Sequence, residues 1–202
     1  MPGTTPSIGV RAMPTSTASA PGKLILFGEH SVVHGYAAVA AALSELRVTV
    51  CAEATTDGNF FAELSDLVSD RQGGGAVALK MQTAELCELL AGWHLLDDWQ
   101  SPTLPSMATI ALIKAGLERH NIPAADIEKL TPLVFLCREL LPELLSCTPA
   151  VGKKRSAPGD GEPNGVRIHV RSADLPLGAG LGSSAAFSVA SAAALVRLRP
   201  AA

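Results

Sequence analysis

Two short segments of this sequence collect the residue types that handle phosphate groups. The first, residues 23–35 (KLILFGEHSVVHG), places Lys23, Glu29, His30 and His34 within a short apolar stretch and the turn after it. A lysine at a strand end presents a cation to phosphate, and glutamate and histidine offer hydrogen bonds to a hydroxylated substrate. The alternative for each histidine is an ordinary core or surface residue.

The second segment is a glycine-rich loop, residues 176–186 (PLGAGLGSSAA), between an expected strand and an expected helix. Gly178, Gly180 and Gly182 let the backbone take positive φ and approach a ligand closely. Ser183 and Ser184 follow at the start of the helix, where unpaired N–H groups and the helix dipole favour an anion. A triphosphate suits this position, and a serine hydroxyl suits its Mg²⁺.

Two common phosphate-binding patterns do not fit this loop. No Gly-Lys-Ser/Thr closes it, as a P-loop requires, and Ser183 stands where a dinucleotide fingerprint needs its third glycine. A glycine-rich turn followed by a serine cap is therefore the alternative interpretation of the segment.

The strands expected around these segments follow from alternation and turn signals. Arg, Thr and Cys alternate with Leu and Val over 46–54, and 166–172 alternates in the same way. An Asp-Gly turn before 60–64 predicts a return strand. Residues 23–30 read as a short strand closed by Gly28, whereas 36–44 fits either a strand or a helix.

The middle and the end of the chain are predicted to be helical. Apolar residues recur at helical spacing within 76–91 and 106–119. A further helix is expected to begin near Asp126, with Pro132 interrupting or restarting it, and 184–198 is a strongly helix-prone run. Strands, then helices, then a strand–loop–helix unit make the expected fold class α+β.

The expected organisation is one incomplete domain over residues 20–202, preceded by a disordered tail at 1–19 that is rich in Ser, Thr, Pro and Gly. Residues 148–165 are expected to form a surface loop by composition. This loop carries the basic run 153–155, which is interpreted as a solvated insertion, with a phosphate clamp as the alternative.

Composition excludes several classes of protein. The 202 residues are 48% hydrophobic and carry a net charge of −3, so no basic excess points to nucleic acid. No apolar run reaches the roughly 18–20 residues of a membrane span. The four cysteines, at positions 51, 87, 137 and 147, form no CxxC pair and are expected to be free buried thiols in a reducing compartment.

Taken together, "APGKLILFGEHSVVHGYAAVA" and "LPLGAGLGSSAAFSVASAAAL" resemble the first and second motifs of the GHMP small-molecule kinases. Within that superfamily, "GEHSVVHG" is similar to the mevalonate kinase family. The resemblance implies a two-layer N-terminal domain and ATP-dependent phosphorylation of the primary hydroxyl of mevalonate. The close resemblance covers about forty residues of the two motifs.

The resemblance also implies roles for individual residues. Lys23 is the lysine of the first motif, near the reacting hydroxyl and the γ-phosphate, and Glu29 and His30 line the mevalonate pocket. Ser184 binds Mg²⁺, and Asp66 falls near the place of a polar residue that contacts the nucleotide. The ATP triphosphate is wrapped by Gly178, Ala179, Gly180, Leu181, Gly182, Ser183 and Ser184.

The sequence stops at Ala202, before the position where members of this superfamily carry their Mg²⁺-binding Glu and catalytic Asp. It is therefore expected to be the N-terminal portion of such an enzyme, inactive alone and exposing apolar surface that a second domain would cover. The alternatives are a non-catalytic fragment that binds nucleotide or a partner, and another GHMP kinase such as phosphomevalonate kinase. A cytoplasmic location is expected, with a peroxisome-like organelle as the alternative, and a homodimer is compatible with the full-length form.

Overall fold

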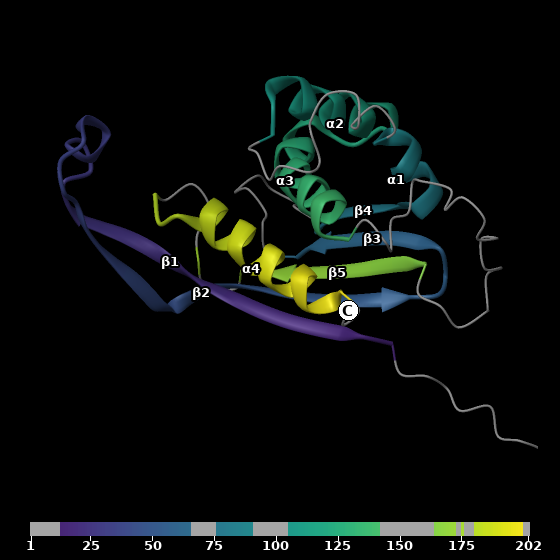
Figure 1. Ribbon diagram of the computed structural model, residues 1–202, viewed down its shortest axis with the longest axis horizontal. Coiled ribbons are helices and arrows are strands. Elements are labelled where there is room, and N and C mark those ends of the chain that lie inside the picture. Colours follow the sequence, from purple (N-terminus) through teal and green to yellow (C-terminus); the bar gives the residue numbers. More distant parts are fainter. Residues whose placement is uncertain are drawn as a thin grey trace, which may run out of the picture.

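A five-stranded mixed sheet with the order β1-β2-β5-β3-β4 organises the chain (Figure 1). The computed structural model describes residues 13–65, 76–90, 105–141, 164–172, 175 and 180–199. All neighbouring strands are antiparallel except β3 and β5, which run parallel. The strands are β1 (Thr15–Phe27), β2 (Val39–Thr55), β3 (Asn59–Leu64), β4 (Val77–Gln82) and β5 (Gly165–Arg171).

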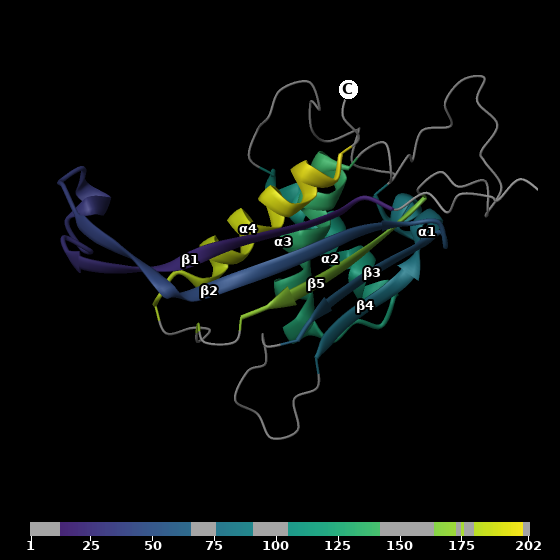
Figure 2. The ribbon, with the colours of Figure 1, turned by 90° about the horizontal axis from the view of Figure 1, so that it is seen from below.

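One face of the sheet forms the core, and the helices lie on that face (Figures 1 and 2). Alternate residues of the strands are buried, as the two-residue period of a half-buried strand requires, for example Val48, Val50 and Ala52 on β2. The helices are α1 (Thr83–Leu89), α2 (Met107–Arg119), α3 (Ala124–Leu140) and α4 (Ser183–Leu198), with a 3₁₀ turn, η1 (Val32–His34). The expected α+β class and the two-layer arrangement are confirmed. Among the described residues, no helix is long and apolar enough to cross a membrane.

The sheet starts earlier in the chain than expected. β1 begins at Thr15, so the part of the expected 1–19 tail from Thr15 onward is a strand. Its small residues Ser16, Ala18 and Ala20 face the core, and pairing with β2 satisfies its backbone groups. Composition missed this segment because Ser and Ala supply little apolar surface by themselves, whereas a neighbouring strand supplies the hydrogen bonds. Residues 1–12 lie outside the described part of the chain.

The expected helix within 76–91 is wrong in its first half. Residues Val77–Gln82 form β4, in which Val77, Leu79 and Met81 are buried and their neighbours are exposed. The period is therefore two rather than 3.6, and β3 supplies the pairing partner. The helix α1 begins only at Thr83, where the Gln82 N–H donates to Glu85 Oε2 at 2.9 Å in a capping box.

Helix α3 runs through Pro132 without a break, so the expected interruption does not occur. A proline inside a helix costs about 3 kcal/mol because one hydrogen bond is lost and the ring crowds the preceding turn. Burial of Leu130, Leu133 and Val134 on the core face offsets that cost. The helices expected at 106–119 and 184–198 are confirmed as α2 and α4, and the ambiguous 36–44 segment enters strand β2 at Val39.

The cysteines are only partly as expected. Cys87 and Cys137 are buried, and burial raises the pKa of the Cys137 thiol far above its ordinary value, which keeps it protonated. Cys51, by contrast, is exposed, because it lies on the face of β2 that the helices leave open. Cys147 and most of the predicted 148–165 loop lie outside the described residues.

Candidate phosphate-binding site

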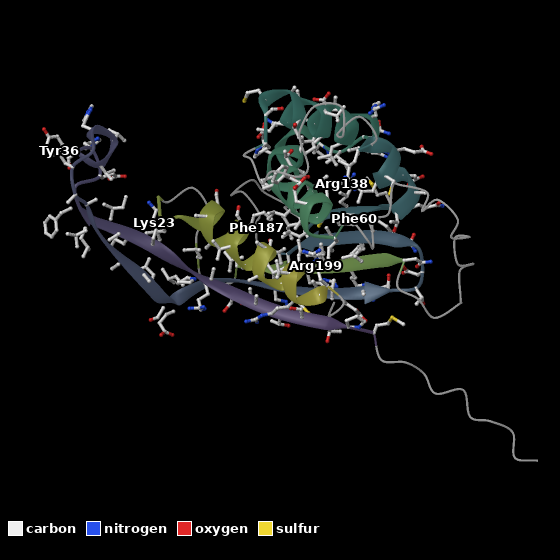
Figure 3. All side chains as sticks on the ribbon, viewed as in Figure 1. Lys23, Tyr36, Phe60, Arg138, Phe187 and Arg199 are labelled. Atoms are coloured by element: carbon white, nitrogen blue, oxygen red, sulfur yellow. The ribbon has the colours of Figure 1, made fainter. Side chains whose placement is uncertain are left out.

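The lysine of the first segment and the glycine loop of the second meet where β1 passes the start of α4. The Lys23 N–H donates to the Leu181 carbonyl at 2.8 Å. The Lys23 side chain also lies against Gly182, because a Cβ placed on that glycine would stand 2.7 Å from Lys23 Cγ. Figure 3 shows Lys23 beside the segment that leads into α4. The two motifs, far apart in the sequence, therefore form one site.

The glycine loop takes a conformation that only glycine adopts easily. Gly180 has φ of 74° and Gly182 has φ of 70°, both in the left-handed region. A Cβ on Gly180 would meet nothing within 4 Å among the described residues, so the backbone there borders open space. A ligand can therefore approach the main chain closely at this glycine.

The N-terminus of α4 presents backbone donors at the same place. Gly182 is the N-cap, and the first bond of the helix runs from the Ala186 N–H to the Gly182 carbonyl at 3.0 Å. The N–H groups of Ser183, Ser184 and Ala185 therefore precede the hydrogen-bonded ladder. Because Gly182 has no side chain to accept from them, these donors suit an anion, which the helix dipole also favours.

The two serines after the loop differ in exposure. Ser183 is buried at 7% relative exposure, whereas Ser184 is exposed. Neither is the cap of α4, since Gly182 holds that position, so the alternative of a plain serine cap is wrong. Of the two hydroxyls, that of Ser184 is the one open to a ligand or to a metal ion bound with it.

Helix α4 is held over β1 and β2 by small side chains. Its core face includes Ala186, Ala190 and Ala194 together with Phe187 and Leu195, all buried. Alanine lets the helix axis approach the strands closely and has the highest helix propensity. The Arg197 Nη1 also donates to the Thr17 carbonyl at 3.3 Å, near the other end of β1. Both ends of α4 therefore contact β1, which fixes the position of the helix N-terminus.

The expected substrate residues Glu29 and His30 are not brought to Lys23. Beyond Gly22, strands β1 and β2 extend past the body of the protein as a hairpin arm, residues 22–43 (Figures 1 and 2). Lys23 lies at the base of this arm, and Glu29 and His30 are exposed in the turn at its tip. At about 3.3 Å per residue, the strand from Lys23 to Phe27 alone spans about 13 Å.

The turn at the tip of the arm is built from short-range hydrogen bonds. Gly28 has φ of 88°, and a Cβ there would stand 2.7 Å from the Ala37 carbonyl oxygen, so glycine is required. Its own carbonyl accepts from the Ser31 hydroxyl at 3.2 Å and from the Val32 N–H at 2.9 Å. These bonds fix the direction of the chain through Glu29 and His30.

The arm carries most of the large apolar side chains that the described residues expose. These are Leu24, Leu26, Phe27, Val32, Val33, Tyr36 and Val39. Figure 3 shows Tyr36 at the end of the arm that is farthest from the helices. The expectation that apolar surface is exposed is therefore met at the arm.

Three of the expected nucleotide residues, Asp66, Gly178 and Ala179, lie outside the described part of the chain. Within the described ranges, no group of three or more His, Cys, Asp or Glu side chains is placed to hold a metal ion. Ser184 supplies one open hydroxyl beside the helix N-terminus. The Ser184 hydroxyl oxygen suits a Mg²⁺ ion that is bound to a phosphate ligand, because most of the oxygens around such an ion come from water and from the phosphates rather than from the protein.

Sequence reasoning missed the residues that join the two motifs. Gly22 is buried against Leu175 and the Leu181 carbonyl, and its missing side chain permits that contact. The signal was a glycine directly before Lys23. A glycine beside a functional lysine indicates a close approach of the backbone, but the sequence does not say to which partner.

The open face of the sheet carries its own charged groups, away from this site. Arg167 pairs with Glu53 at 3.5 Å, and His169 Nδ1 lies 3.0 Å from Glu63 Oε2. Partial burial acts to raise the pKa of Asp57. Hydrogen bonds from Thr55 and Asn59, with the Arg167 charge, outweigh that effect and hold the pKa below its ordinary value. These groups link β5 to its neighbours β2 and β3 in the middle of the sheet and to the turn between β2 and β3.

Comparison with known proteins defines the class first. Residues 145–200 match the family model described as "GHMP kinases N terminal domain", a range that includes the glycine loop and α4. The fold is similar to that of the Methanococcus jannaschii mevalonate kinase, with a TM-score of 0.50 and 20% identity, over 90% of this chain and 39% of that one. The chain therefore carries the fold of a GHMP kinase N-terminal domain.

The relatives within that class are mevalonate kinases. The chain is 35% identical to mevalonate kinase of Homo sapiens over 178 residues, which cover 88% of this chain and 38% of that protein. It is 30% identical to mevalonate kinase of Schizosaccharomyces pombe over 183 residues, covering 88% of this chain and 36% of that protein. The chain is therefore similar to mevalonate kinases, and it spans little more than a third of the length of these relatives.

Proposed function

We propose that this chain forms the nucleotide-binding part of a mevalonate kinase, which transfers the γ-phosphate of ATP to the primary hydroxyl of mevalonate. The observation that carries the proposal is the contact between Lys23 and residues Leu181 and Gly182, which brings a cation to a helix N-terminus suited to phosphate. The relatives are mevalonate kinases by name, and the two motifs are the segments that meet here.

Each part of the site has a role in this proposal. The N–H groups of Ser183, Ser184 and Ala185 bind phosphate oxygens, and the open backbone at Gly180 admits the phosphate chain. The Ser184 hydroxyl holds Mg²⁺, which supplies positive charge to the transferring phosphoryl group. Lys23 stabilises the same spreading charge from the side of β1, because phosphoryl transfer depends mainly on positioning and charge neutralisation.

The other residues expected to bind a ligand complete the proposal. Gly178 and Ala179 complete the loop around the triphosphate. Glu29 and His30 contact mevalonate, for which the tip of the arm must come to Lys23 from its extended position in this structure. Asp66 contacts the nucleotide. The protein acts on a small molecule in isoprenoid and sterol biosynthesis, without a nucleic acid or membrane partner, as a cytoplasmic protein that forms a homodimer in its full-length form.

The test is ADP formation that depends on both ATP and mevalonate, measured with the full-length product of the gene in the presence of Mg²⁺. Phosphomevalonate supplied in place of mevalonate distinguishes a phosphomevalonate kinase. Turnover with mevalonate that Lys23→Met reduces about 100-fold supports the proposal, since that is the loss expected when a preorganised charge is removed. Turnover only with phosphomevalonate, or none with either compound, contradicts it.

A second candidate is a non-catalytic protein that binds nucleotide or a partner. The observation that favours it is the apolar surface of the hairpin arm, where Phe27 is 75% and Val33 is 76% exposed. Exposed apolar surface of this kind marks interaction sites in folded proteins. Nucleotide binding without turnover by the full-length product would select this candidate.

A further inference from the structure

The two ends of the glycine loop are attached to two consecutive residues of β1. At the end that leads into α4, the Leu181 carbonyl accepts from the Lys23 N–H at 2.8 Å. At the end that follows β5, the Leu175 side chain lies against Gly22, where a Cβ would stand 2.7 Å from Leu175 Cδ1. The loop is therefore held at both ends by Gly22 and Lys23.

The Leu175 end is fixed by a buried hydrogen bond. Ser172 directly follows β5 and is 4% exposed, and its hydroxyl donates to the Leu175 carbonyl at 3.0 Å. Leu175 itself is 2% exposed. A buried hydroxyl bond of this kind contributes about 1 kcal/mol, and losing the hydroxyl leaves a buried carbonyl without this donor. The end of β5 is thus tied to the point where the loop touches β1.

Gly22 makes this contact possible. The position of its absent Cβ is 2.7 Å from Leu175 Cδ1 and 3.0 Å from the Leu181 carbonyl oxygen, so any side chain would push both ends of the loop away from β1. Because Lys23 is the next residue, a shift of the loop at Gly22 changes the distance from the Lys23 side chain to the N-terminus of α4.

We propose that Ser172 and Leu175 are positioning residues for the bound phosphate. They act through Gly22, and they set the distance between the Lys23 charge and the backbone donors at the start of α4. The inference rests on the proposed function for the identity of the ligand, Mg·ATP. The attachment of the loop to Gly22 through Ser172 and Leu175, here called the clamp, does not depend on the ligand, and amide exchange of the loop measures it separately.

The first experiment compares Ser172→Ala with Thr131→Ala. The control is matched, because Thr131 is also buried and its hydroxyl also donates to a backbone carbonyl, that of Ile127 at 2.7 Å, but it lies on α3 away from the loop. Both variants are expected to lose similar thermal stability. Only Ser172→Ala should weaken Mg·ATP binding, by about 5- to 10-fold, and speed amide exchange at 181–185, and Ser172→Thr should restore both.

The second experiment is a double-mutant cycle. Gly22→Ala alone should weaken Mg·ATP binding, and Leu175→Val makes room for the added methyl group. The Mg·ATP affinity of the double variant should therefore be at least about threefold higher than the sum of the two single effects predicts, because the two residues are in contact and their effects are coupled. The cycle also serves if Ser172→Ala does not fold.

The outcomes of these experiments distinguish a failure of the positioning role from a failure of the proposed ligand, Mg·ATP. Additive losses in the cycle, or loop exchange that Ser172→Ala and Thr131→Ala change equally, overturn the positioning role. Faster amide exchange of the loop in Ser172→Ala, but not in Thr131→Ala, supports the clamp. If the wild-type chain binds no Mg·ATP, the proposed ligand is contradicted, but this exchange result still supports the clamp.

Discussion

The side chain of Lys23 lies directly over the backbone of Gly182, where a Cβ would stand 2.7 Å from Lys23 Cγ. This contact joins the lysine of one motif to the N-cap of the helix that follows the other. It explains why the site needs glycine at position 182 for two reasons. One is the positive φ of 70°, and the other is the room that the lysine occupies.

Gly182→Ala and Gly180→Ala separate these two reasons. Both residues have positive φ, so each substitution should lower the free energy of unfolding by about 1–2 kcal/mol. Only the Cβ at position 182 collides with Lys23. We therefore expect a larger loss of Mg·ATP affinity for Gly182→Ala, measured by calorimetric titration beside thermal melting. Equal affinity losses at the two positions would show that the lysine contact has no role.

Lys23→Met keeps most of the side-chain stem and removes the charge. Lys23 is exposed, so the melting temperature should stay near that of the wild type, whereas affinity for Mg·ATP should fall because one cation beside the phosphate is lost. Lys80→Met is the control, since Lys80 is an exposed lysine on β4. If the two variants bind equally well, Lys23 does not contact the nucleotide.

Ser184→Ala tests the hydroxyl at the start of α4. Because Gly182 is the cap, the substitution should leave stability nearly unchanged, but the gain in ATP affinity on adding Mg²⁺ should shrink. Ser188→Ala is the control on the same helix, where the hydroxyl donates to the Ser184 carbonyl at 3.0 Å. Titrations with and without EDTA measure the effect, and an unchanged Mg²⁺ dependence in Ser184→Ala removes the hydroxyl from the metal site.

Phe27→Ala and Phe60→Ala compare the arm with the core. Phe27 is 75% exposed and Phe60 is fully buried. The core substitution should cost about 3–5 kcal/mol through lost packing, and the arm substitution should cost no more than about 0.5 kcal/mol. Urea unfolding measures both. A large cost at Phe27 would mean that the arm is covered in solution.

Asp57→Asn tests how the free energy of unfolding changes at acid pH. The pKa of Asp57 is lowered in the folded state, so its contribution is present above the unfolded pKa, about 3.9, and is lost as the pH falls through the folded value. The wild type should therefore lose stability on acidification below about pH 4 more steeply than Asp57→Asn. Thermal melts between pH 7 and the acid limit, at constant ionic strength, measure the difference, and parallel curves contradict it.

The local sequence determined much of the fold. Alternation predicted the inner part of β2 and all but the first residue of β5, and helical spacing predicted α2 and most of α3. The local sequence also located the glycine loop before α4, because clustered glycines and an alanine-rich run determine backbone conformation within a few residues. Those signals are local, so they can be read without knowing the partner of any element.

Only the tertiary structure decided the rest. Strand β1 extends back to Thr15 because β2 pairs with it, and β4 is a strand because β3 lies beside it. The insertion of β5 between β2 and β3 then carries the loop after it to Gly22 and Lys23. The sequence identified Lys23 and the glycine loop as candidate site residues. Their contact depends on long-range strand pairing and close packing, which no local pattern encodes.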